Sequence, residues 1–533
     1  MKHKLAIDFG TTNTVLARWN DEKDDSEIIN LDGIGYKASD DLPYLVPSLV
    51  YINDGKSGAI TCGQRVRVAG LNLKRDNRLF RNFKRGIVSS PAPESRVIDD
   101  VSWADRDAGR VFIQKLIEVA PFAHDEIEQL VLTAPVASFE GYLAWLNGVI
   151  DEITLDKVRV VDESTAAALG YAVTKPGAVV LVFDFGGGTL DLSLVQLPES
   201  RSKVGGFIKR LLGGKSGQHT ARVIAKAGRI IGGSDVDQWL LAEVLERSGL
   251  TTQELGNDYT KLLTLCEKAK IDLSTDEETI ISFDVSGKEY NLTITRQELE
   301  SLLEENKLFS SLRRVVDKVM HVARQRGIFK EDIHYVLLVG GTSLMPSVQR
   351  TLGQYFTDMA VRADKPFTAV AEGALQVAAG YGLEDYLMHS YGLRYLDEEI
   401  GEHAFDEIIS MGSGYPTSSS VEVILGAAHE GQTEVEFVIG EIDSDSVAMV
   451  EVRYEDGQAV FVAQAGSSQQ QIILLNEDEA GGILAKLDPS GTIGENRIKA
   501  DFSIDDRRRL RVTVVDMQTN KKLLDDVAVV TLR

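Results

Sequence analysis

The chain has 533 residues, of which 43% are hydrophobic and 26% charged, and its formal net charge is −24 at pH 7. Because one hydrophobic core stops growing at roughly 250–300 residues, we expect two or more domains. The acidic balance argues against nucleic acid or an anionic membrane as a general partner, since like charges repel.

The two cysteines, Cys62 and Cys266, lack the spacing of a zinc site or a disulfide framework, which suits a reducing compartment. The N-terminal stretch MKHKLAIDFG has only a short apolar run before Asp8, less than a signal peptide needs. No window approaches the roughly 18–20 uninterrupted apolar residues of a membrane span. The sequence therefore predicts a cytoplasmic protein without a membrane span.

The first elements are strands and helices in alternation. Apolar residues on both sides of Gly10 predict two strands, KLAIDFG and TVLARWN, around a tight turn. Apolar residues at helical spacing predict an amphipathic helix over 107–120. The strand over 128–135 stops at Pro135, which cannot donate a hydrogen bond to a sheet.

The alternation continues to about residue 382. An alanine-rich helix over 163–173 follows the strand VRVV. The longest helical segment is 293–328, where Thr295 and Glu298 form a capping box and Gly327 is a suitable stop. Residues 333–356 predict a buried strand, a double-glycine turn and a new helix. This region is therefore expected to be α/β.

After about residue 383 the apolar residues alternate with period two in six segments separated by turn residues. This pattern predicts an antiparallel β-sandwich. The connection between the regions, GLEDYLMHSYGL, is either an ordinary ordered connection or a linker that docks and releases. The segment 199–223 is basic and glycine-rich; its GGKS is not a P-loop, because Lys209 occupies the position of the required glycine. It is either a mobile surface insertion or a patch for an anionic partner.

Two similar acidic glycine turns, LAIDFGTTNTVLA and VFDFGGGTLDLS, point to one phosphate site. Backbone N–H groups of such turns form a nest for phosphate oxygens. Asp8, Asp184 and Asp191 would be repelled by phosphate unless a hard cation such as Mg²⁺ lay between them. Each turn alone is equally explained as a tight hairpin, but the recurrence indicates two related half-domains with a cleft between them.

Phosphoryl transfer also requires positioned charges. Lys84 and Arg85 are candidates, although a solvated basic face explains them as well. Glu163 stands at the start of a predicted helix, where capping and complementing the helix dipole are the alternative roles.

Eight motifs occur in the order found in the 70-kDa heat-shock chaperone family, which belongs to the actin and sugar-kinase-like ATPase superfamily. They are Asp8 to Asn13, Lys84-Arg85, Pro135, VVDESTAAALGYA, VFDFGGGTLDLS, GGSDVD, EKAKIDLS and VLLVGGTSLMP. The chain resembles this family over essentially its whole length. The resemblance implies a two-lobed, actin-like α/β ATPase domain of duplicated halves at 1–382, a linker at 383–392, and an all-β antiparallel sandwich that binds peptide at 393–533.

The resemblance also implies roles for individual residues. The phosphate loops are Asp8, Thr11, Thr12, Asn13 and Gly186, Gly187, Gly188, Thr189. Lys84 orients the γ-phosphate and the attacking water, Glu163 and Asp184 surround Mg²⁺ and that water, and Thr189 faces the γ-phosphate. Asp191 closes the second loop, and Asp8, Asp184 and Asp191 form the metal set.

Three further sets follow from the same resemblance. The adenosine pocket comprises Gly232, Gly233, Glu267, Lys270, Ser274, Gly340, Gly341 and Thr342. Arg85 and Pro135 relay the nucleotide state outward. Phe405, Ala428 and Val435 line a groove for an extended apolar peptide, although a place in the core explains each of them equally.

The sequence departs from the family in the adenosine pocket, in the linker and at the C-terminal end. Leu344 and Ile271 stand where arginines are expected to stack on adenine, and Phe367 stands where an aspartate is usual. Since cation–π stacking is lost, we predict weaker or less selective adenine binding. The linker lacks its leucine run, and the chain ends at DDVAVVTLR without the family's helical lid, so bound peptide is expected to exchange quickly.

The expected function is that of a monomeric, chaperone-like, slow ATPase that binds ATP or ADP with Mg²⁺ and couples hydrolysis to binding of unfolded or extended peptide segments. A co-chaperone and a nucleotide-exchange factor are expected partners. The alternatives are a nucleotide-sensing or scaffolding module of the same fold without a chaperone cycle, and a cytoskeletal or sugar-kinase relative.

Overall fold

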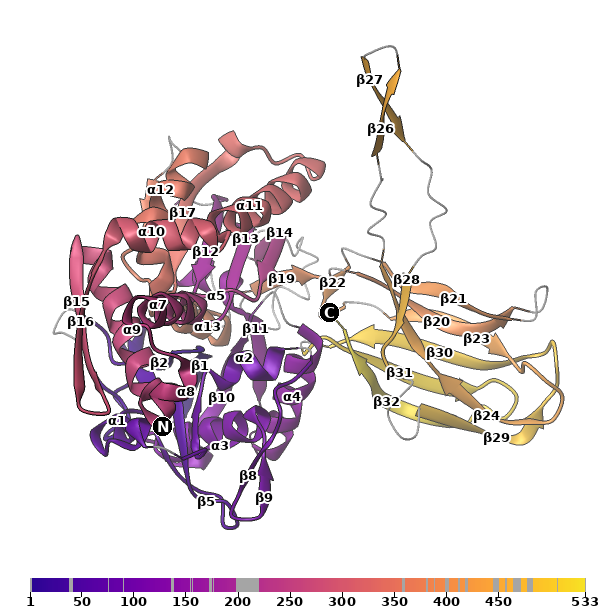
Figure 1. The fold of residues 1–533 in the computed structure, drawn as a ribbon. Coiled ribbons are helices and arrows are strands. Elements are labelled where there is room, and N and C mark those ends of the chain that lie inside the picture. Colours follow the sequence, from indigo (N-terminus) through magenta and orange to yellow (C-terminus); the bar gives the residue numbers. More distant parts are fainter. Residues whose placement is uncertain are drawn as a thin grey trace. The chain divides into compact units, whose positions relative to one another are not determined.

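A computed structural model divides the chain into two compact units, Met1–Leu383 and Glu384–Arg533 (Figure 1). The structure describes residues 2–37, 42–74, 76–89, 91–135, 139–153, 155, 157–171, 175, 177–197, 220–356, 360–379, 382–387, 389–397, 402–410, 413–417, 420–443, 450–455, 458–463, 471–476, 483–505 and 507–532. Residues 199–219 of the basic segment lie outside this part, so both interpretations of the segment stay open.

The first unit contains two larger sheets built on the same plan. The first has the strand order β11-β10-β1-β2-β3, with β4 also paired to β2. The strands are β1 (His3–Phe9), β2 (Asn13–Asn20), β3 (Asp25–Ile28), β4 (Val46–Pro47), β10 (Ile127–Ala134) and β11 (Val158–Asp162). β1 is antiparallel to β2 and parallel to β10. The strands predicted around Gly10 and before Pro135 are confirmed.

The second sheet repeats this arrangement in the order β18-β17-β12-β13-β14. Its strands are β12 (Val179–Phe185), β13 (Leu190–Gln196), β14 (Thr220–Arg229), β17 (Ile333–Val339) and β18 (Ala360–Arg362). β12 is antiparallel to β13 and parallel to β17. In each sheet, an acidic glycine turn therefore joins the two strands of an antiparallel hairpin, and the first strand of that hairpin has a parallel neighbour on its other side.

Helices separate and cover the two sheets. α5 (Glu163–Gly170) and α13 (Ala369–Ala378) share one core with the facing sides of both sheets. α2 (Phe83–Val88), α3 (Asp105–Glu118) and α4 (Phe139–Glu152) pack on the other side of the first sheet. The outer side of the second sheet is covered by α7 (Gly233–Ser248), α9 (Tyr259–Thr275), α10 (Arg296–Glu305), α11 (Leu308–Gln325) and α12 (Pro346–Tyr355). Strands buried on both faces explain the long apolar runs of the sequence.

Smaller elements complete the first unit. They are α1 (Gln64–Val68), α8 (Thr252–Leu255), β5 (Leu49–Asp54), β6 (Ala59–Cys62), β7 (Leu79–Arg81), β8 (Arg96–Ile98), β9 (Val101–Trp103), β15 (Glu278–Val285) and β16 (Lys288–Thr295), with 3-10 turns at Leu71–Leu73, His124–Glu126, Gly256–Asp258, Lys330–Asp332 and Gly341–Leu344. None of the helices in the described ranges has the length and apolar character of a bilayer-crossing segment.

The long helical segment predicted over 293–328 consists of two helices rather than one. The capping box is confirmed: the Glu298 amide donates to the Thr295 hydroxyl, and the Thr295 amide donates to the Glu298 carboxylate at 2.7 Å. α10 ends at Glu305, and Lys307 has a left-handed backbone with φ of 59° before α11 begins. A left-handed residue interrupts a right-handed helix, which is why the segment is divided.

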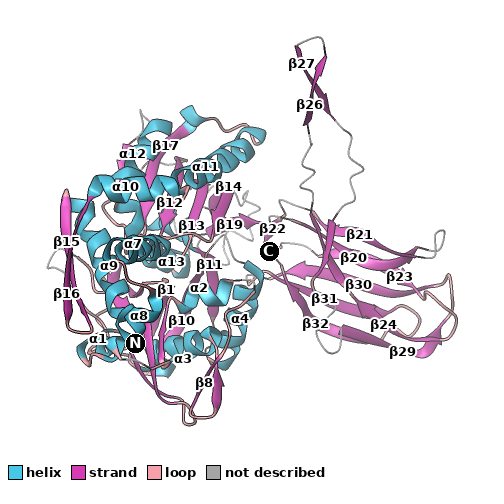
Figure 2. Ribbon diagram, viewed as in Figure 1, coloured by secondary structure: helices cyan, strands magenta, loops and turns pink. Residues whose placement is uncertain are grey.

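The described residues of the second unit form strands joined by turns, without a helix among them (Figure 2). Its two larger sheets have the orders β21-β20-β25-β28 and β23-β30-β31-β32. The strands are β19 (Gly382–Tyr386), β20 (Ser390–Asp397), β21 (Glu402–Ile409), β22 (Gly414–Tyr415), β23 (Val421–Gly426), β24 (Gln432–Phe437), β25 (Ile439–Asp443), β26 (Val450–Glu455), β27 (Gln458–Ala463), β28 (Gln471–Leu474), β29 (Ile483–Gly491), β30 (Asn496–Ile504), β31 (Arg509–Asp516) and β32 (Lys522–Thr531). All pairings described within this unit's named strands are antiparallel.

Apolar residues of both larger sheets meet in one core, which includes Leu393 and Ile439 from one sheet and Phe502 and Val512 from the other. This is the predicted sandwich. The fold class of duplicated α/β halves followed by an antiparallel β-sandwich is confirmed. Leu387, from the connection between the two regions, is fully buried in the same core, and its amide donates to the Ser413 carbonyl.

Candidate functional site

Both acidic glycine turns line one cavity of about 840 Å³ in the first unit. The first turn contributes Asp8 and Gly10 to Asn13, and the second contributes Asp184 and Gly186 to Thr189. The turns also contact each other. A Cβ atom on Gly188 would lie only 2.5 Å from the Thr11 hydroxyl oxygen, and one on Gly187 would collide with the Thr12 hydroxyl. Glycine is therefore needed where the two hairpins approach each other, and the isolated-hairpin interpretation does not describe them.

Many of the other predicted residues line the same cavity. They are Lys84, Glu163, Glu267, Lys270, Ser274, Gly340, Gly341 and Thr342, together with the departures Ile271, Leu344 and Phe367. Five of the residues predicted in the first unit are absent from the lining of this cavity, namely Arg85, Pro135, Asp191, Gly232 and Gly233.

A buried ion pair lies at the edge of the cavity. The Lys84 Nζ atom is 2.6 Å from the Glu163 Oε1 atom, and both side chains are almost completely buried. The Lys84 ammonium also lies over the rings of Phe9 and Tyr142, at 5.6 and 5.7 Å from their centres. A solvated basic face is therefore the wrong interpretation for Lys84. The start of α5 is capped by Asp162, which accepts from the Thr165 amide, so the Glu163 side chain is free to bind Lys84.

The buried charges shift one another's ionisation. Burial raises the pKa of Glu163 to about 7, and the nearby Asp8 carboxylate adds to this, while Lys84 opposes it. Burial also raises the pKa of Asp8, against the effect of Lys84 and of the Thr133 hydroxyl, which donates to Asp8 at 3.0 Å. The pKa of Asp184 is raised well above its ordinary value by burial and by the carboxyl groups around it. Burial opposes the charge of Lys84, but Glu163 and Asp8 outweigh it and raise the pKa of this lysine.

Asp191, in β13 just after the second turn, does not line the cavity. It is directly opposite Asp184 in the β12–β13 ladder and is fully buried. Burial raises the pKa of Asp191 to about 8, against a hydrogen bond from the Thr189 side chain. Asp191 therefore lies on the same face of the hairpin as Asp184 but is covered, whereas Asp8 and Asp184 line the cavity.

The glycine pair 232–233 supports the second turn from the start of α7. The Gly233 amide donates to the Gly186 carbonyl at 3.0 Å, and the Ser234 amide donates to the Gly187 carbonyl at 2.8 Å. The Thr342 hydroxyl donates to the same Gly186 carbonyl at 2.8 Å. These bonds fix the carbonyl groups of the turn, and the Gly186 amide closes the turn by donating to the Thr189 carbonyl at 3.1 Å.

Residues of α9 line a further part of the cavity. Lys270 Nζ lies 2.7 Å from Asp237 Oδ1, and Ser274 donates to the Lys270 carbonyl. Burial raises the pKa of Asp237 to about 6, although Lys270 opposes this. Ile271 is 59% exposed on the same helix. Ile271, Leu344 and Phe367 make part of the cavity lining apolar.

Arg85 and Pro135 lie beside the cavity. The Arg85 guanidinium is 2.8 Å from the Asp235 carboxylate in the first turn of α7, so it connects α2 with α7. Pro135 is buried and follows the last residue of β10.

The three residues predicted for a peptide groove are half-buried in the second unit. Phe405 of β21 lies over β25, because a Cβ atom on Gly440 would be 2.7 Å from its ring. Val435 of β24 packs against the sandwich core. Ala428 follows β23, and its amide donates to the Gln432 side chain.

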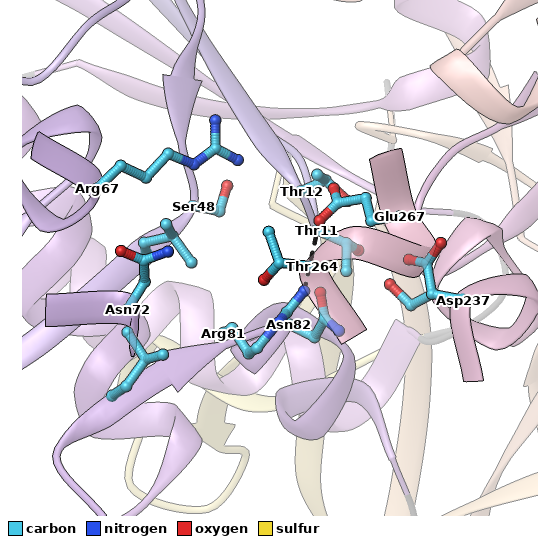
Figure 3. Close-up of a pocket in the computed structure, with 13 residues that line it drawn as sticks. Thr11, Thr12, Ser48, Arg67, Asn72, Arg81, Asn82, Asp237, Thr264 and Glu267 are labelled. Atoms are coloured by element: carbon cyan, nitrogen blue, oxygen red, sulfur yellow. Dashed lines mark hydrogen bonds and ion pairs between the residues drawn. The ribbon is translucent and has the colours of Figure 1, made fainter. Parts of the chain in front are cut away.

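A second, small cavity of about 30 Å³ adjoins the first turn (Figure 3). Thr11 and Thr12 line it on one side in this view, and Arg67 and Asn72 on the other. Arg81 of β7 and Glu267 of α9 approach each other across it at 3.5 Å, drawn as the dashed line in Figure 3.

Sequence reasoning missed four residues that hold the site together. Ser48 donates to the Gly10 carbonyl at 2.6 Å, Thr133 donates to Asp8, Tyr142 lies against Lys84, and the Tyr36 hydroxyl donates to Asn13 Oδ1 at 3.3 Å. No local pattern marks these positions, because each contact partner is distant in the sequence.

In the described ranges, no group of three or more His, Cys, Asp or Glu side chains is placed to hold a metal ion alone. Mg²⁺ commonly takes only one or two carboxylates from the protein and completes its shell with phosphate oxygens and water. The cavity carboxylates Asp8 and Asp184 match that donor set.

The sequence of the chain is similar to those of known proteins. A model of the Hsp70 protein family matches residues 111–448. The chain is 29% identical over 462 residues to the chaperone protein DnaK of Thermotoga petrophila, covering 81% of this chain and 69% of that protein. It is 27% identical to the DnaK proteins of Thermosipho melanesiensis, over 549 residues, and Thermosipho africanus, over 550 residues, which in both cases covers 98% of this chain and 79% of the relative.

Proposed function

The chain belongs to the Hsp70 family, and from this premise we propose that its first unit binds ATP with Mg²⁺ and hydrolyses it slowly. We further propose that the bound nucleotide alters the affinity of the second unit for extended apolar peptide segments. The observation that carries the proposal is the convergence of both glycine turns, Lys84 and Glu163 on one cavity. The first unit would then be an ATPase domain, the segment 383–392 its linker, and the sandwich the peptide-binding domain.

The cavity residues suit a triphosphate with its metal. The amides of both turns would bind phosphate oxygens, as glycine nests do. Asp8 and Asp184 would hold Mg²⁺, directly or through water, with Asp191 fixing the second turn behind them. When bound, Mg²⁺ neutralises phosphate charge that the two carboxylates would otherwise repel.

The chain's own residues supply the remaining chemistry. The Lys84 ammonium, held by Glu163, would orient the outer phosphate and the attacking water, and the Thr189 hydroxyl would face the same phosphate. Glu163 keeps the buried Lys84 ammonium in a fixed position. Positioned charge is the main requirement of phosphoryl transfer. The far end, with Glu267, Lys270 and Ser274, would hold the ribose and the base.

The apolar base end leads to a prediction about affinity. Replacing Leu344 with arginine is expected to tighten ADP binding by roughly 3- to 10-fold, because a guanidinium can stack on the base. Titration calorimetry of ADP and GDP with the wild type and the variant measures the effect. The matched control is Ile280→Arg, on β15, where the side chain is 63% exposed and lines neither cavity. A wild type that binds ADP as tightly as the arginine variant would refute the expected weakness.

Coupling of the two units is tested with a fluorescent extended apolar peptide. Its affinity for the full chain is measured by anisotropy with saturating ADP and with saturating ATP, both in Mg²⁺. The proposal requires two different affinities, and loss of that difference in Arg85→Ala, which removes the contact with Asp235. Equal affinities in the wild type would instead indicate a nucleotide-sensing or scaffolding module, and no peptide binding would remove the chaperone part of the proposal.

A further inference from the structure

Arg67, near the end of α1, lines both the nucleotide cavity and the small cavity beside the first turn. Thr11 and Thr12 of the first turn also line both cavities. In Figure 3 the Arg67 side chain extends from α1 in the direction of Ser48 and Thr12. No motif of the sequence singles out this residue, and the proposed reaction has so far given it no role.

The cations around these cavities differ in their partners. Lys84 pairs with Glu163, Lys270 with Asp237 and Arg81 with Glu267. Within the part of the chain that the structure describes, no carboxylate lies at ion-pair distance from Arg67, whose contact is with an aromatic ring. Lys268 is exposed and lines only the larger cavity. Arg67 thus lies next to the first turn and, unlike Lys84 and Arg81, forms no ion pair with a carboxylate in the described ranges.

The guanidinium is nevertheless held in place. It lies over the ring of Tyr36, 5.3 Å from the ring centre. The Tyr36 hydroxyl donates to Asn13 of the first turn at 3.3 Å, and the Tyr36 backbone pairs with Leu45 through hydrogen bonds of 2.8 and 2.9 Å. Stacking on an aromatic ring leaves the guanidinium N–H groups free to donate in its plane. The Arg67 head group is therefore positioned beside the first turn, and among the described residues no hydrogen bond occupies its side-chain donors.

We propose that Arg67 binds the outermost phosphate of the nucleotide in the cavity. A planar guanidinium matches phosphate oxygens with paired hydrogen bonds, and the partly enclosed site strengthens the attraction. Tyr36 acts as the platform that keeps this side chain next to Thr11 and Thr12. The inference deepens the proposed function and rests on it, since it assumes that a nucleotide occupies the cavity.

The test measures binding of Mg·ATP, Mg·ADP and adenosine to the full chain by titration calorimetry. Arg67→Ala is expected to weaken ATP binding roughly tenfold or more, the effect of losing hydrogen bonds to a charged group. ADP binding is expected to weaken less, and adenosine binding to stay unchanged. Arg67→Lys, which keeps the charge but loses the planar fork, is expected to fall between wild type and Arg67→Ala.

The matched control is Arg65→Ala on the same helix. Arg65 lies against Gly33, where an added Cβ atom would be 2.7 Å from its guanidinium, and it lines neither cavity. Its loss is expected to change none of the three affinities. An unchanged ATP affinity in Arg67→Ala, or an equal loss for adenosine, would overturn the inference and leave the proposed function standing. A wild type that binds no ATP would instead overturn the proposed function and the inference with it.

Discussion

Replacing Lys84 with methionine is expected to lower the single-turnover rate of ATP hydrolysis at least 100-fold, the scale of losing one preorganised charge at a reacting phosphate. Methionine fills a similar space between the Phe9 and Tyr142 rings but carries no charge. The rate is measured with Mg·ATP and excess protein. ATP affinity is expected to change much less, because the two glycine turns remain.

The same substitution separates a chemical role for Lys84 from a structural one. Burial already raises the pKa of Glu163 to about 7, so this carboxyl can take up a proton when its partner is removed. Urea unfolding is therefore expected to show a loss of only about 1–2 kcal/mol. The double variant Lys84→Met/Glu163→Gln is expected to recover part of that stability and none of the rate.

Lys56→Met is the control for loss of a lysine elsewhere. Its ammonium pairs with Asp100 at 3.1 Å on the surface, where ion pairs contribute little. Rate and stability are both expected to match the wild type. If Lys84→Met hydrolysed ATP as fast as this control, Lys84 would have no part in the reaction.

The hairpins and their turns could be predicted because their signals are local. An apolar run, Asp-Phe-Gly and a second apolar run lie within one short segment, and the strands on both sides of Gly10 and of Gly186 to Gly188 follow directly. That the same pattern occurs twice also indicated two related lobes. The repeated sheet arrangement confirms this expectation.

Contacts between distant segments could not be predicted. Ser48, between β4 and β5, donates a hydrogen bond to the Gly10 carbonyl. Thr133 of β10, the parallel neighbour of β1, donates to Asp8. The pairing of β1 with β10 brings Thr133 to this place, and nothing in the sequence around Thr133 reports that pairing. A hydroxyl in a buried strand has many explanations until its neighbours are known.

How deeply a side chain is buried, and where a helix is interrupted, were also difficult to predict. Asp184 and Asp191 both adjoin the second glycine turn, and the sequence treats them alike. The ladder places them opposite each other, so their side chains share one face of the hairpin, but Asp184 lines the cavity whereas Asp191 is fully buried and does not. The division of 293–328 at Lys307 is a similar case, because lysine is usually a good helix former and its left-handed backbone has no local signal.

Replacing Gly170 or Gly373 with alanine is expected to destabilise the first unit by about 3 kcal/mol or more, the upper range for overpacking. These glycines lie where α5 and α13 cross. A Cβ atom on Gly170 would collide with the Ala369 carbonyl oxygen, and one on Gly373 with the Ala166 carbonyl oxygen. Backbone atoms cannot move aside as a flexible side chain can, so the helices must separate. Urea unfolding, followed by tryptophan fluorescence and circular dichroism, measures the loss.

Helical glycines without such neighbours provide the control. Nothing lies within 4 Å of a Cβ atom added to Gly148 in α4 or Gly353 in α12. Alanine there is expected to leave stability unchanged or raise it by up to about 1 kcal/mol, because it lowers the entropy of the unfolded chain. Equal unfolding midpoints for Gly170→Ala and Gly148→Ala would show that α5 and α13 are not in close contact.

The crossing of α5 and α13 also bears on the site, because α5 begins with Glu163, which binds Lys84. Separating the helices at Gly170 is expected to shift α5 and weaken that ion pair. The rate is measured without urea, at a temperature at which both variants fold. Per folded molecule, Gly170→Ala should hydrolyse ATP more slowly than Gly148→Ala. A normal rate per folded molecule would mean that the Glu163–Lys84 pair is positioned independently of the crossing.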